Sequence, residues 1–114
     1  MQVGTIGIVG SREFNDLVRL TKFMMQFKPK VIISGGARGA DYLAKIYAQN
    51  QGIDYKEFPA EWDKYGRSAG YRRNIDIVEN SDIIIAFWDG TSKGIKHTID
   101  IAREKNKPLY IERF

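Results

Sequence analysis

Short apolar runs alternate along the chain with segments in which apolar residues recur at helical spacing. The runs that lack polar alternation predict strands buried on both faces of a sheet. Strands are predicted over residues 3–9, 30–34, 53–58, 82–88 and 108–111, with 82–88 at the centre of the sheet. Helices are predicted from Asn15 or Asp16 to Phe27 and over residues 40–51, 71–80 and 95–106, and residues 59–70 are predicted to form a loop.

Strand and helix alternate throughout this pattern, which is typical of a parallel sheet covered by helices on both faces. A chain of 114 residues is long enough for one hydrophobic core and too short for two. We therefore expect a single Rossmann-like α/β domain over residues 1–114, with three layers and about five parallel strands. In such sheets ligands bind beyond the carboxyl ends of the strands, so functional residues are expected there.

The composition excludes several kinds of site. The chain has no cysteine, so it has no disulfide framework, no thiolate metal site and no cysteine nucleophile. Its one histidine, His97, has no partner at a metal-binding spacing and is predicted to pack at the surface. We therefore expect no metal and no cofactor. Neither a signal peptide nor an apolar run of membrane-spanning length is present, which predicts a cytoplasmic protein without membrane contact.

Positive charge gathers at one predicted edge of the sheet. Lys and Arg number 18 against 14 Asp and Glu. The loops that follow the first four strands each carry a cation beside small residues, which favours an anion site over charge spread at random. We expect ligand contacts there from Gly10, Ser11, Arg12, Ser34, Gly35, Gly36, Arg38, Gly39, Arg67, Arg72, Arg73, Asp89, Gly90, Ser92, Lys93, Gly94 and Lys96.

Residues 35–39 form the most informative of these loops. Their glycines directly follow a buried strand and let backbone amides approach a phosphate at the N-terminus of the next helix. We predict a phosphate cradle here, and the alternative is an ordinary strand-to-helix turn. Gly4, Gly7 and Gly10 lie inside the first strand instead, where they would let a helix or a ligand pack closely.

Four segments carry a resemblance to a known family: GSREF at 10–14, SGGARGAD at 34–41, AEWDKYGRSAGYRRN at 60–74 and DGTSKG at 89–94. Together they resemble the SLOG superfamily, and within it the short YspA-like members of bacteria and phages. The resemblance implies a Rossmann-like fold that binds nucleotides, relatives of ADP-ribose or other nucleotide-derived ligands. Members of the superfamily include sensor domains of bacterial immunity, DNA-processing proteins of the DprA type and the LOG phosphoribohydrolases.

The resemblance also implies which residues contact the ligand. Gly10, Ser11 and Arg12 would form the first ligand loop, and the second would add Asp41 to Ser34, Gly35, Gly36 and Gly39. Asp41 stands in the first turn of its helix, where it would contact a ribose hydroxyl or simply stabilise the helix. The third loop would contribute Asn74 beside Arg67, Arg72 and Arg73.

Arginines and rings are interleaved in that third loop. Arg67, Arg72 and Arg73 repel each other unless an anion joins them, which favours a pyrophosphate or phosphodiester ligand. Tyr65 and Tyr71 could stack on a base, whereas Trp62 is predicted to pack the loop onto the sheet. Trp88, at the end of the fourth strand, has the same choice between ligand stacking and packing.

One departure from the family affects the predicted activity. The LOG phosphoribohydrolases carry a PGGxGTxxE loop whose Glu is required for cleavage, and Thr98 stands at that position here. We therefore expect binding without cleavage, as a sensor or as a sponge that sequesters a signalling nucleotide during phage infection or bacterial immunity. The alternative is an enzyme that cleaves N-glycosidic bonds of nucleotides. Its candidate acids are Glu57, Glu61, Asp63 and Asp89. Single-stranded nucleic-acid binding of the DprA type is the third hypothesis.

The first predicted helix indicates a homo-oligomer. It carries Phe23, Met24, Met25 and Phe27, which is more apolar surface than one side of a helix needs. A dimer or tetramer would bury that surface. The alternative is one broad stripe that faces the core of the same chain.

Overall fold

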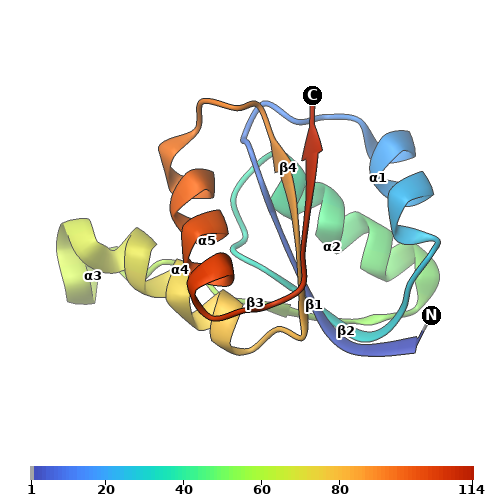
Figure 1. The fold of residues 1–114 in the computed structure, drawn as a ribbon, viewed down its shortest axis with the longest axis horizontal. Helices are drawn as coiled ribbons and strands as arrows, with labels where there is room; N and C mark the ends of the chain where they lie inside the picture. The colour runs from blue at the N-terminus through green and yellow to red at the C-terminus, as the bar shows by residue number, and fades with distance from the viewer. Residues whose placement is uncertain (1) are drawn as a thin grey trace.

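A computed structural model of the protein describes residues 2–114 as a five-stranded sheet with helices on both faces (Figure 1). The strand order is β3-β2-β1-β4-β5, and every neighbouring pair is parallel. The predicted Rossmann-like α/β fold is confirmed. The strands are β1 (Gln2–Gly10), β2 (Lys28–Ser34), β3 (Asp54–Glu57), β4 (Ile83–Trp88) and β5 (Leu109–Arg113).

Two helices cover each face of this sheet, as Figure 1 shows. The helices are α1 (Leu17–Met24), α2 (Ala40–Gln51), α3 (Trp62–Tyr65), α4 (Ala69–Glu79) and α5 (Lys93–Glu104), with a 3-10 turn over Gly66–Ser68. On one face α1 and α2 bury Leu20 and Tyr47, and on the other α4 and α5 bury Ile77 and Ile99. The order of the strands reverses between β1 and β4, so a crevice is expected at their carboxyl ends.

The centre of the sheet is β1, whereas the sequence pattern predicted 82–88. The predicted strand corresponds to β4, which is interior and paired on both sides by β1 and β5. The apolar pattern of β4 indicates that both of its faces are buried. Every interior strand of such a sheet is buried in the same way. Apolar content therefore does not distinguish the middle strand from its neighbour.

Glycines of β1 allow the close packing that their positions predicted. A Cβ atom at Gly7 would lie 2.4 Å from the Ser81 hydroxyl oxygen, and one at Gly10 would lie 2.3 Å from the Cβ of Ala40. Ala40 is the first residue of α2, which thereby approaches the end of β1. This approach brings the β1–α1 and β2–α2 loops together at one edge of the sheet.

Several boundaries differ from those predicted. The expected loop over residues 59–70 contains α3 and the 3-10 turn, and α4 begins at Ala69 rather than Tyr71. The turn of α3 is closed by the Glu61 carbonyl, which accepts bonds from the Lys64 and Tyr65 amides. No buried apolar residue accompanies it, so hydrophobic periodicity could not signal it.

The first helix also ends earlier than predicted, at Met24. Strand β2 then begins at Lys28 and includes Pro29. Pairing of β2 with β3 starts at Val31, so the missing N–H of Pro29 leaves no ladder bond unmade on that side. Asp16 is the N-cap of α1, and its carboxylate accepts a bond from the Arg19 amide.

The apolar residues of α1 are mostly used inside the chain. Met24 and Phe27 are buried, Phe23 packs against the same core cluster, and Met25 remains 70% exposed. A core-facing stripe thus accounts for most of this surface, and the homo-oligomer stays a prediction. None of the helices within residues 2–114 has the length and apolar character needed to cross a membrane.

Candidate functional site

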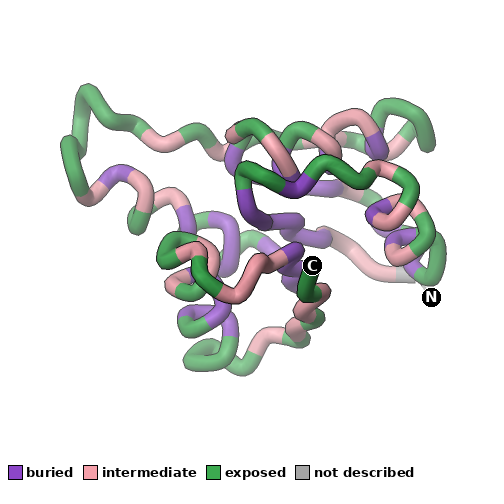
Figure 2. The backbone as a smooth tube through the Cα atoms, turned by 90° about the horizontal axis from the view of Figure 1, so that it is seen from above, coloured by how far each residue is buried: buried purple, intermediate pink, exposed green. Residues whose placement is uncertain are grey.

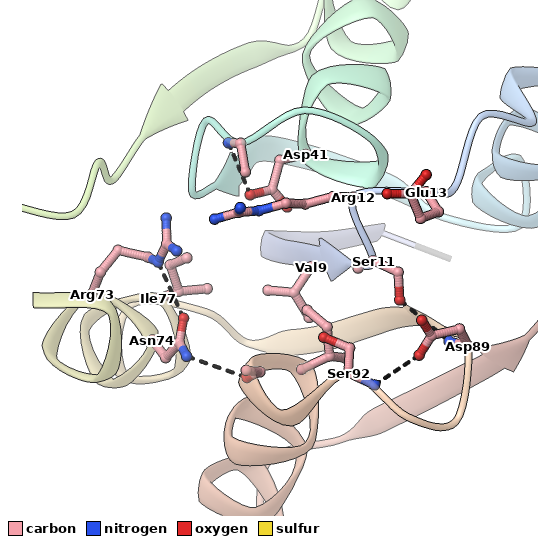
Figure 3. A pocket seen from close by; sticks show the side chains of 14 residues that line it. Val9, Ser11, Arg12, Glu13, Asp41, Arg73, Asn74, Ile77, Asp89 and Ser92 are labelled. Atoms are coloured by element: carbon pink, nitrogen blue, oxygen red, sulfur yellow. Dashed lines mark hydrogen bonds between the residues drawn. The ribbon is translucent and has the colours of Figure 1, made fainter. Parts of the chain in front are cut away.

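A polar cavity of about 410 Å³ lies at the carboxyl ends of β1 and β4, where the strand order reverses (Figure 3). Its volume is within the range of small-molecule ligand pockets. Four segments that are distant in sequence contribute to it: the end of β1 with its loop, the β2–α2 loop, α4, and the β4–α5 loop. The lining residues are Val9, Gly10, Ser11, Arg12, Glu13, Ala37, Asp41, Arg73, Asn74, Ile77, Asp89, Ser92, Gly94 and Ile95.

Hydrogen bonds hold two of these loops together. The Ser11 amide donates to the Phe87 carbonyl at 2.9 Å, and the Asp89 amide donates to the Ser11 hydroxyl at 3.3 Å. The Asp89 carboxylate accepts from the Thr91 and Ser92 amides at 2.9 and 2.8 Å. These two backbone bonds lower the pKa of Asp89. The carboxylate charge therefore stabilises the turn that precedes α5.

This turn places the N-terminus of α5 at the cavity. Gly94 and Ile95, in the first turn of the helix, are both part of the lining. The first N–H groups of a helix have no acceptor within the helix, and the helix dipole favours a negative charge there. This wall of the cavity can therefore receive an anion.

Two arginines enter the cavity from opposite walls. Figure 3 shows Arg12 extending from the β1–α1 loop and Arg73 extending from α4. The Arg73 guanidinium donates to the Gly35 carbonyl at 2.9 Å and to the Asn74 side-chain oxygen at 3.1 Å. Within residues 2–114, neither arginine has a carboxylate oxygen within 4.0 Å. The charge of Arg12 is therefore available to a ligand, whereas the charge of Arg73 also acts on the nearby Asp41 carboxyl.

Asn74 fixes the position of Arg73. It is 8% exposed, and its amide nitrogen lies 3.3 Å from both the Gly94 carbonyl oxygen and Nδ1 of His97. His97 also packs against the Tyr71 ring, and burial lowers its pKa. The side chain of Asn74 thus joins α4 to the start of α5 behind the cavity.

Asp41 is a carboxyl group in an unusual environment. It is 6% exposed and lies in the first turn of α2, as the sequence predicted. Burial raises its pKa to about 6, while the Ala37 amide and the Arg73 charge act in the opposite direction. Its Oδ2 atom accepts from the Ala37 amide at 3.2 Å. Near neutral pH this group can exchange a proton.

The same bond bears on the predicted phosphate cradle over residues 35–39. The Ala37 amide, which a phosphate would need, is occupied by Asp41. A Cβ atom at Gly36 would lie 2.5 Å from the carboxyl carbon of Glu57, so a second acid lies against this loop. Gly36 and Gly39 have φ values of 80° and 82°, which explains why glycine stands there. The phosphate cradle stays a prediction, and one of its backbone amides already donates to Asp41.

The predicted site residues divide into two groups. Those that the structure places in the cavity lining are Gly10, Ser11, Arg12, Asp41, Arg73, Asn74, Asp89, Ser92 and Gly94. Those that lie outside this lining are Ser34, Gly35, Gly36, Arg38, Gly39, Arg67, Arg72, Trp88, Gly90, Lys93 and Lys96. The cavity therefore includes residues from all four predicted loops, but fewer of their side chains than the sequence predicted.

The residues outside the lining have other contacts. Ser34 is buried, and its hydroxyl lies 2.5 Å from that of Tyr55. Arg38 pairs with Glu13 on the surface, and Lys96 pairs with Asp100 along α5. These partners compete with any ligand for the two cations.

The three arginines of the third loop take different positions. Arg73 faces the cavity, whereas the Arg72 guanidinium lies 4.4 Å from the centre of the Tyr65 ring and Arg67 is exposed in the 3-10 turn. Arg72 and Arg73 are consecutive residues of a helix, so their side chains leave it in directions about 100° apart. An anion that joins all three stays a prediction, and Arg67 lies apart from the other two, which both line a second, smaller cavity.

The two tryptophans also differ. Trp62, predicted to pack onto the sheet, is 56% exposed on α3, because that helix projects away from the sheet. Trp88 donates its indole N–H to the Ser92 carbonyl at 3.1 Å, and the Arg113 guanidinium lies over its ring. Trp88 therefore packs within the chain at the rim of the β4–α5 loop.

Sequence reasoning missed five residues of the lining. These are Val9, Glu13, Ala37, Ile77 and Ile95. Glu13 directly follows Arg12 in the predicted ligand loop, a signal that could have found it. Of the four acids predicted as candidates for chemistry, only Asp89 belongs to the lining, while Thr98 is buried and donates to the Gly94 carbonyl.

Comparison with known proteins identifies the family. The model of the family described as YspA, cpYpsA-related SLOG family matches residues 6–65. The Gene 61 protein of Mycobacterium phage D29 is 34% identical over 85 residues, which cover 69% of this chain and 68% of the phage protein. This chain belongs to the SLOG family. The resemblance inferred from its sequence motifs is thereby confirmed.

This SLOG protein shares its fold with solved structures. DNA processing protein A (DprA) from Streptococcus pneumoniae matches with a TM-score of 0.75 at 18% identity, over 94% of this chain and 49% of that one. DprA from Helicobacter pylori, studied for its single-stranded DNA binding mode, matches with a TM-score of 0.62 at 19% identity, over 94% and 64%. The chain thus spans about half of one DprA and less than two thirds of the other.

Proposed function

We propose that this SLOG protein binds a nucleotide-derived ligand in the cavity between β1 and β4. The observation that carries the proposal is the pair of arginines, Arg12 and Arg73, which enter one cavity, neither of them within 4.0 Å of a carboxylate oxygen in residues 2–114. Guanidinium groups bind phosphate oxygens through strong, charge-assisted hydrogen bonds. The first turn of α5 supplies further backbone donors to this cavity.

The remaining lining suits the rest of a nucleotide. Asp41 and the Ser11 and Ser92 side chains offer acceptors and hydroxyls to a ribose. Ile95, which is partly exposed, gives an apolar surface on which a base can lie. The class of ligand is therefore a phosphorylated nucleoside derivative, such as a relative of ADP-ribose or a cyclic nucleotide.

The protein acts, in this proposal, as a sensor or as a sponge. The position of the LOG glutamate is taken by Thr98, which is buried within α5 and outside the cavity lining. Binding without cleavage is the activity that this lining supports. A binding protein of this kind would hold a signalling nucleotide away from its receptor or report its presence.

Calorimetry with a panel of nucleoside monophosphates, ADP-ribose, cyclic ADP-ribose and cyclic dinucleotides tests the proposal. At least one ligand should bind, and Arg73→Gln should weaken that binding about tenfold or more, the loss expected for one charge-assisted bond. Arg103→Gln, at the exposed far end of α5, is the matched control and should bind as the wild type does. Chromatography of the same mixtures should recover the ligand intact, and release of a free base would indicate the hydrolase instead.

Single-stranded DNA binding is the second candidate, favoured by rings on the projecting α3–α4 region. Trp62 and Tyr71 are 56% and 54% exposed, and Lys64, Arg67 and Arg72 lie near them in sequence. Stacked bases and neutralised phosphates are the usual means of binding single strands. The DprA from Helicobacter pylori, which shares the fold, binds single-stranded DNA.

Fluorescence anisotropy with a labelled oligonucleotide tests this second candidate. The logarithm of the binding constant should fall with the logarithm of salt concentration by about 0.7 for each phosphate contacted. Trp62→Ala should weaken binding, while Tyr110→Ala, a partly exposed ring on β5, should not. Binding that ignores both salt and Trp62 would reject the candidate.

A further inference from the structure

A second, smaller cavity adjoins the first and shares Arg73 with it. It lies between α3 and α4, has a volume of about 130 Å³, and is lined by Pro59, Glu61, Lys64, Tyr65, Ala69, Arg72, Arg73 and Asp76. This volume is below the range of independent ligand pockets, which begins near about 300 Å³. The shared arginine instead makes it an extension of the larger cavity.

Two cations converge in the second cavity on one ring. Lys64 Nζ lies 5.1 Å and Arg72 Cζ lies 4.4 Å from the centre of the Tyr65 ring. Neither has a carboxylate oxygen within 4.0 Å in the described part of the chain, although Arg72 Nε donates to the Ser68 hydroxyl. The two cations repel each other, Glu61 offsets part of this repulsion at Lys64, and a bound anion would relieve the rest.

Acids in the same cavity restrict what that anion can be. Glu61 and Asp76 contribute two carboxylates to the lining, so a densely charged phosphate group would be repelled. A phosphodiester carries a single charge. The nucleoside beyond it brings ribose hydroxyls and base amino groups, which carboxylates accept as hydrogen-bond donors.

We infer that the ligand spans both cavities around Arg73 and is a dinucleotide, with one nucleotide in the larger cavity, the phosphodiester in the second cavity, and the second nucleoside extending beyond it along α3 and α4. Arg73 lies between the two ligand halves and can contact the phosphates of both. Lys64 and Arg72 bind the phosphodiester and thereby determine specificity for a dinucleotide over a mononucleotide. This inference rests on the proposed function of the larger cavity.

The test compares each of the four nucleoside 5′-monophosphates with the matching 5′-phosphorylated linear dinucleotide and the 3′,5′-cyclic dinucleotide by calorimetry. In the wild type at least one dinucleotide should bind about tenfold or more tightly than its monophosphate, as one added charge-assisted bond predicts. In the double variant Lys64→Gln/Arg72→Gln the ratio of the two affinities should fall to about one. Lys22→Gln, an exposed cation on α1, should leave the ratio as in the wild type.

The outcomes separate the inference from the proposal on which it rests. Monophosphates that bind as tightly as dinucleotides overturn the inference and leave the proposed function standing. A dinucleotide advantage that survives the double variant overturns the role of the second cavity. Failure of every nucleotide to bind overturns both. An advantage that continues to grow in longer oligonucleotides supports the phosphodiester contact and identifies single-stranded nucleic acid as its source.

Discussion

At the scale of single residues, burial of the Asp41 carboxyl lowers the stability of the folded protein. Its carboxyl is buried, and its pKa of about 6 lies above the ordinary value of 3.8. The folded protein therefore binds a proton more tightly than the unfolded chain does. Stability falls as pH rises between these two values, and the full cost remains above them. A group kept at such a cost is a candidate for function.

Replacing this carboxyl should stabilise the protein. In Asp41→Asn the amide oxygen can still accept the Ala37 N–H, and the charge is gone. We expect the free energy of unfolding at pH 7 to rise by about 1–3 kcal/mol, since one pKa unit corresponds to about 1.4 kcal/mol. Urea denaturation should show the gain growing between pH 4 and pH 7. A gain that is constant with pH, or equal in the exposed Asp54→Asn control, would contradict the burial argument.

Two glycines at the cavity should respond to alanine in opposite ways. In Gly10→Ala the new methyl would lie 2.3 Å from Ala40 Cβ and 2.8 Å from the Phe87 carbonyl oxygen, so backbone must move. We expect a loss of about 1–3 kcal/mol, typical of overpacking. Gly94 has open space and helical backbone, so Gly94→Ala should gain up to about 1 kcal/mol. Thermal unfolding of both variants measures the difference in sign.

At the scale of elements, the turn between β4 and α5 determines where the wall proposed to bind phosphate begins. The Asp89 carboxylate binds two successive amides, and this closes the chain into α5 at Lys93 rather than at the predicted residue 95. The helix end that reaches the cavity is thus positioned by an acid in the loop. The repulsion expected between this acid and a phosphate is reduced because its charge is shared with backbone donors.

The stabilising effect of Asp89 should depend on pH. Its pKa is lowered in the folded state, so its contribution is present above the ordinary carboxyl value and is lost as pH falls through the folded value. Asp89→Ala should lower the thermal midpoint at pH 7, and the difference from the wild type should shrink in acid. Asp89→Asn, which keeps one acceptor, should lose less. Equal losses at pH 7 and in acid would show that the turn does not need the charge.

At the scale of the whole molecule, one segment stands apart from the two packed layers of helices. Residues 61–67, which include α3, are all exposed, and Figure 2 shows this segment projecting from the buried centre. Few apolar contacts hold it, so its local free energy of opening should be the lowest among the internal elements. The second cavity is formed on its inner side.

Limited proteolysis should detect this local opening. Trypsin should cleave first after Lys64 or Arg67, because cleavage of native proteins follows the population of open segments. Mass spectrometry of the early fragments identifies the site. The double variant Lys64→Gln/Arg67→Gln should delay the first cut and move it elsewhere. An initial cut in the Arg38 loop instead would place the weakest segment on the other side of the cavity.

Much of the architecture follows from local pattern. Every predicted strand and helix exists, because apolar spacing and turn residues act over a few positions. The short helix α3 was missed because it buries nothing. The predicted loops meet at one edge of the sheet, where the cavity lies, yet which of Arg72 and Arg73 faces that cavity depends on how α4 is rotated against α5.

The sequence by itself determined the order of strand and helix, the parallel sheet, the family and the loops that meet at one edge. These properties depend on covalent order and on which residues leave water, and both can be read along the chain. Only the tertiary structure decided which side chains share the cavity: it brought Glu13 and Ile77 in, turned Arg72 onto Tyr65 and joined a second cavity through Arg73. The physical reason is that side-chain direction is set by the packing of elements far apart in sequence.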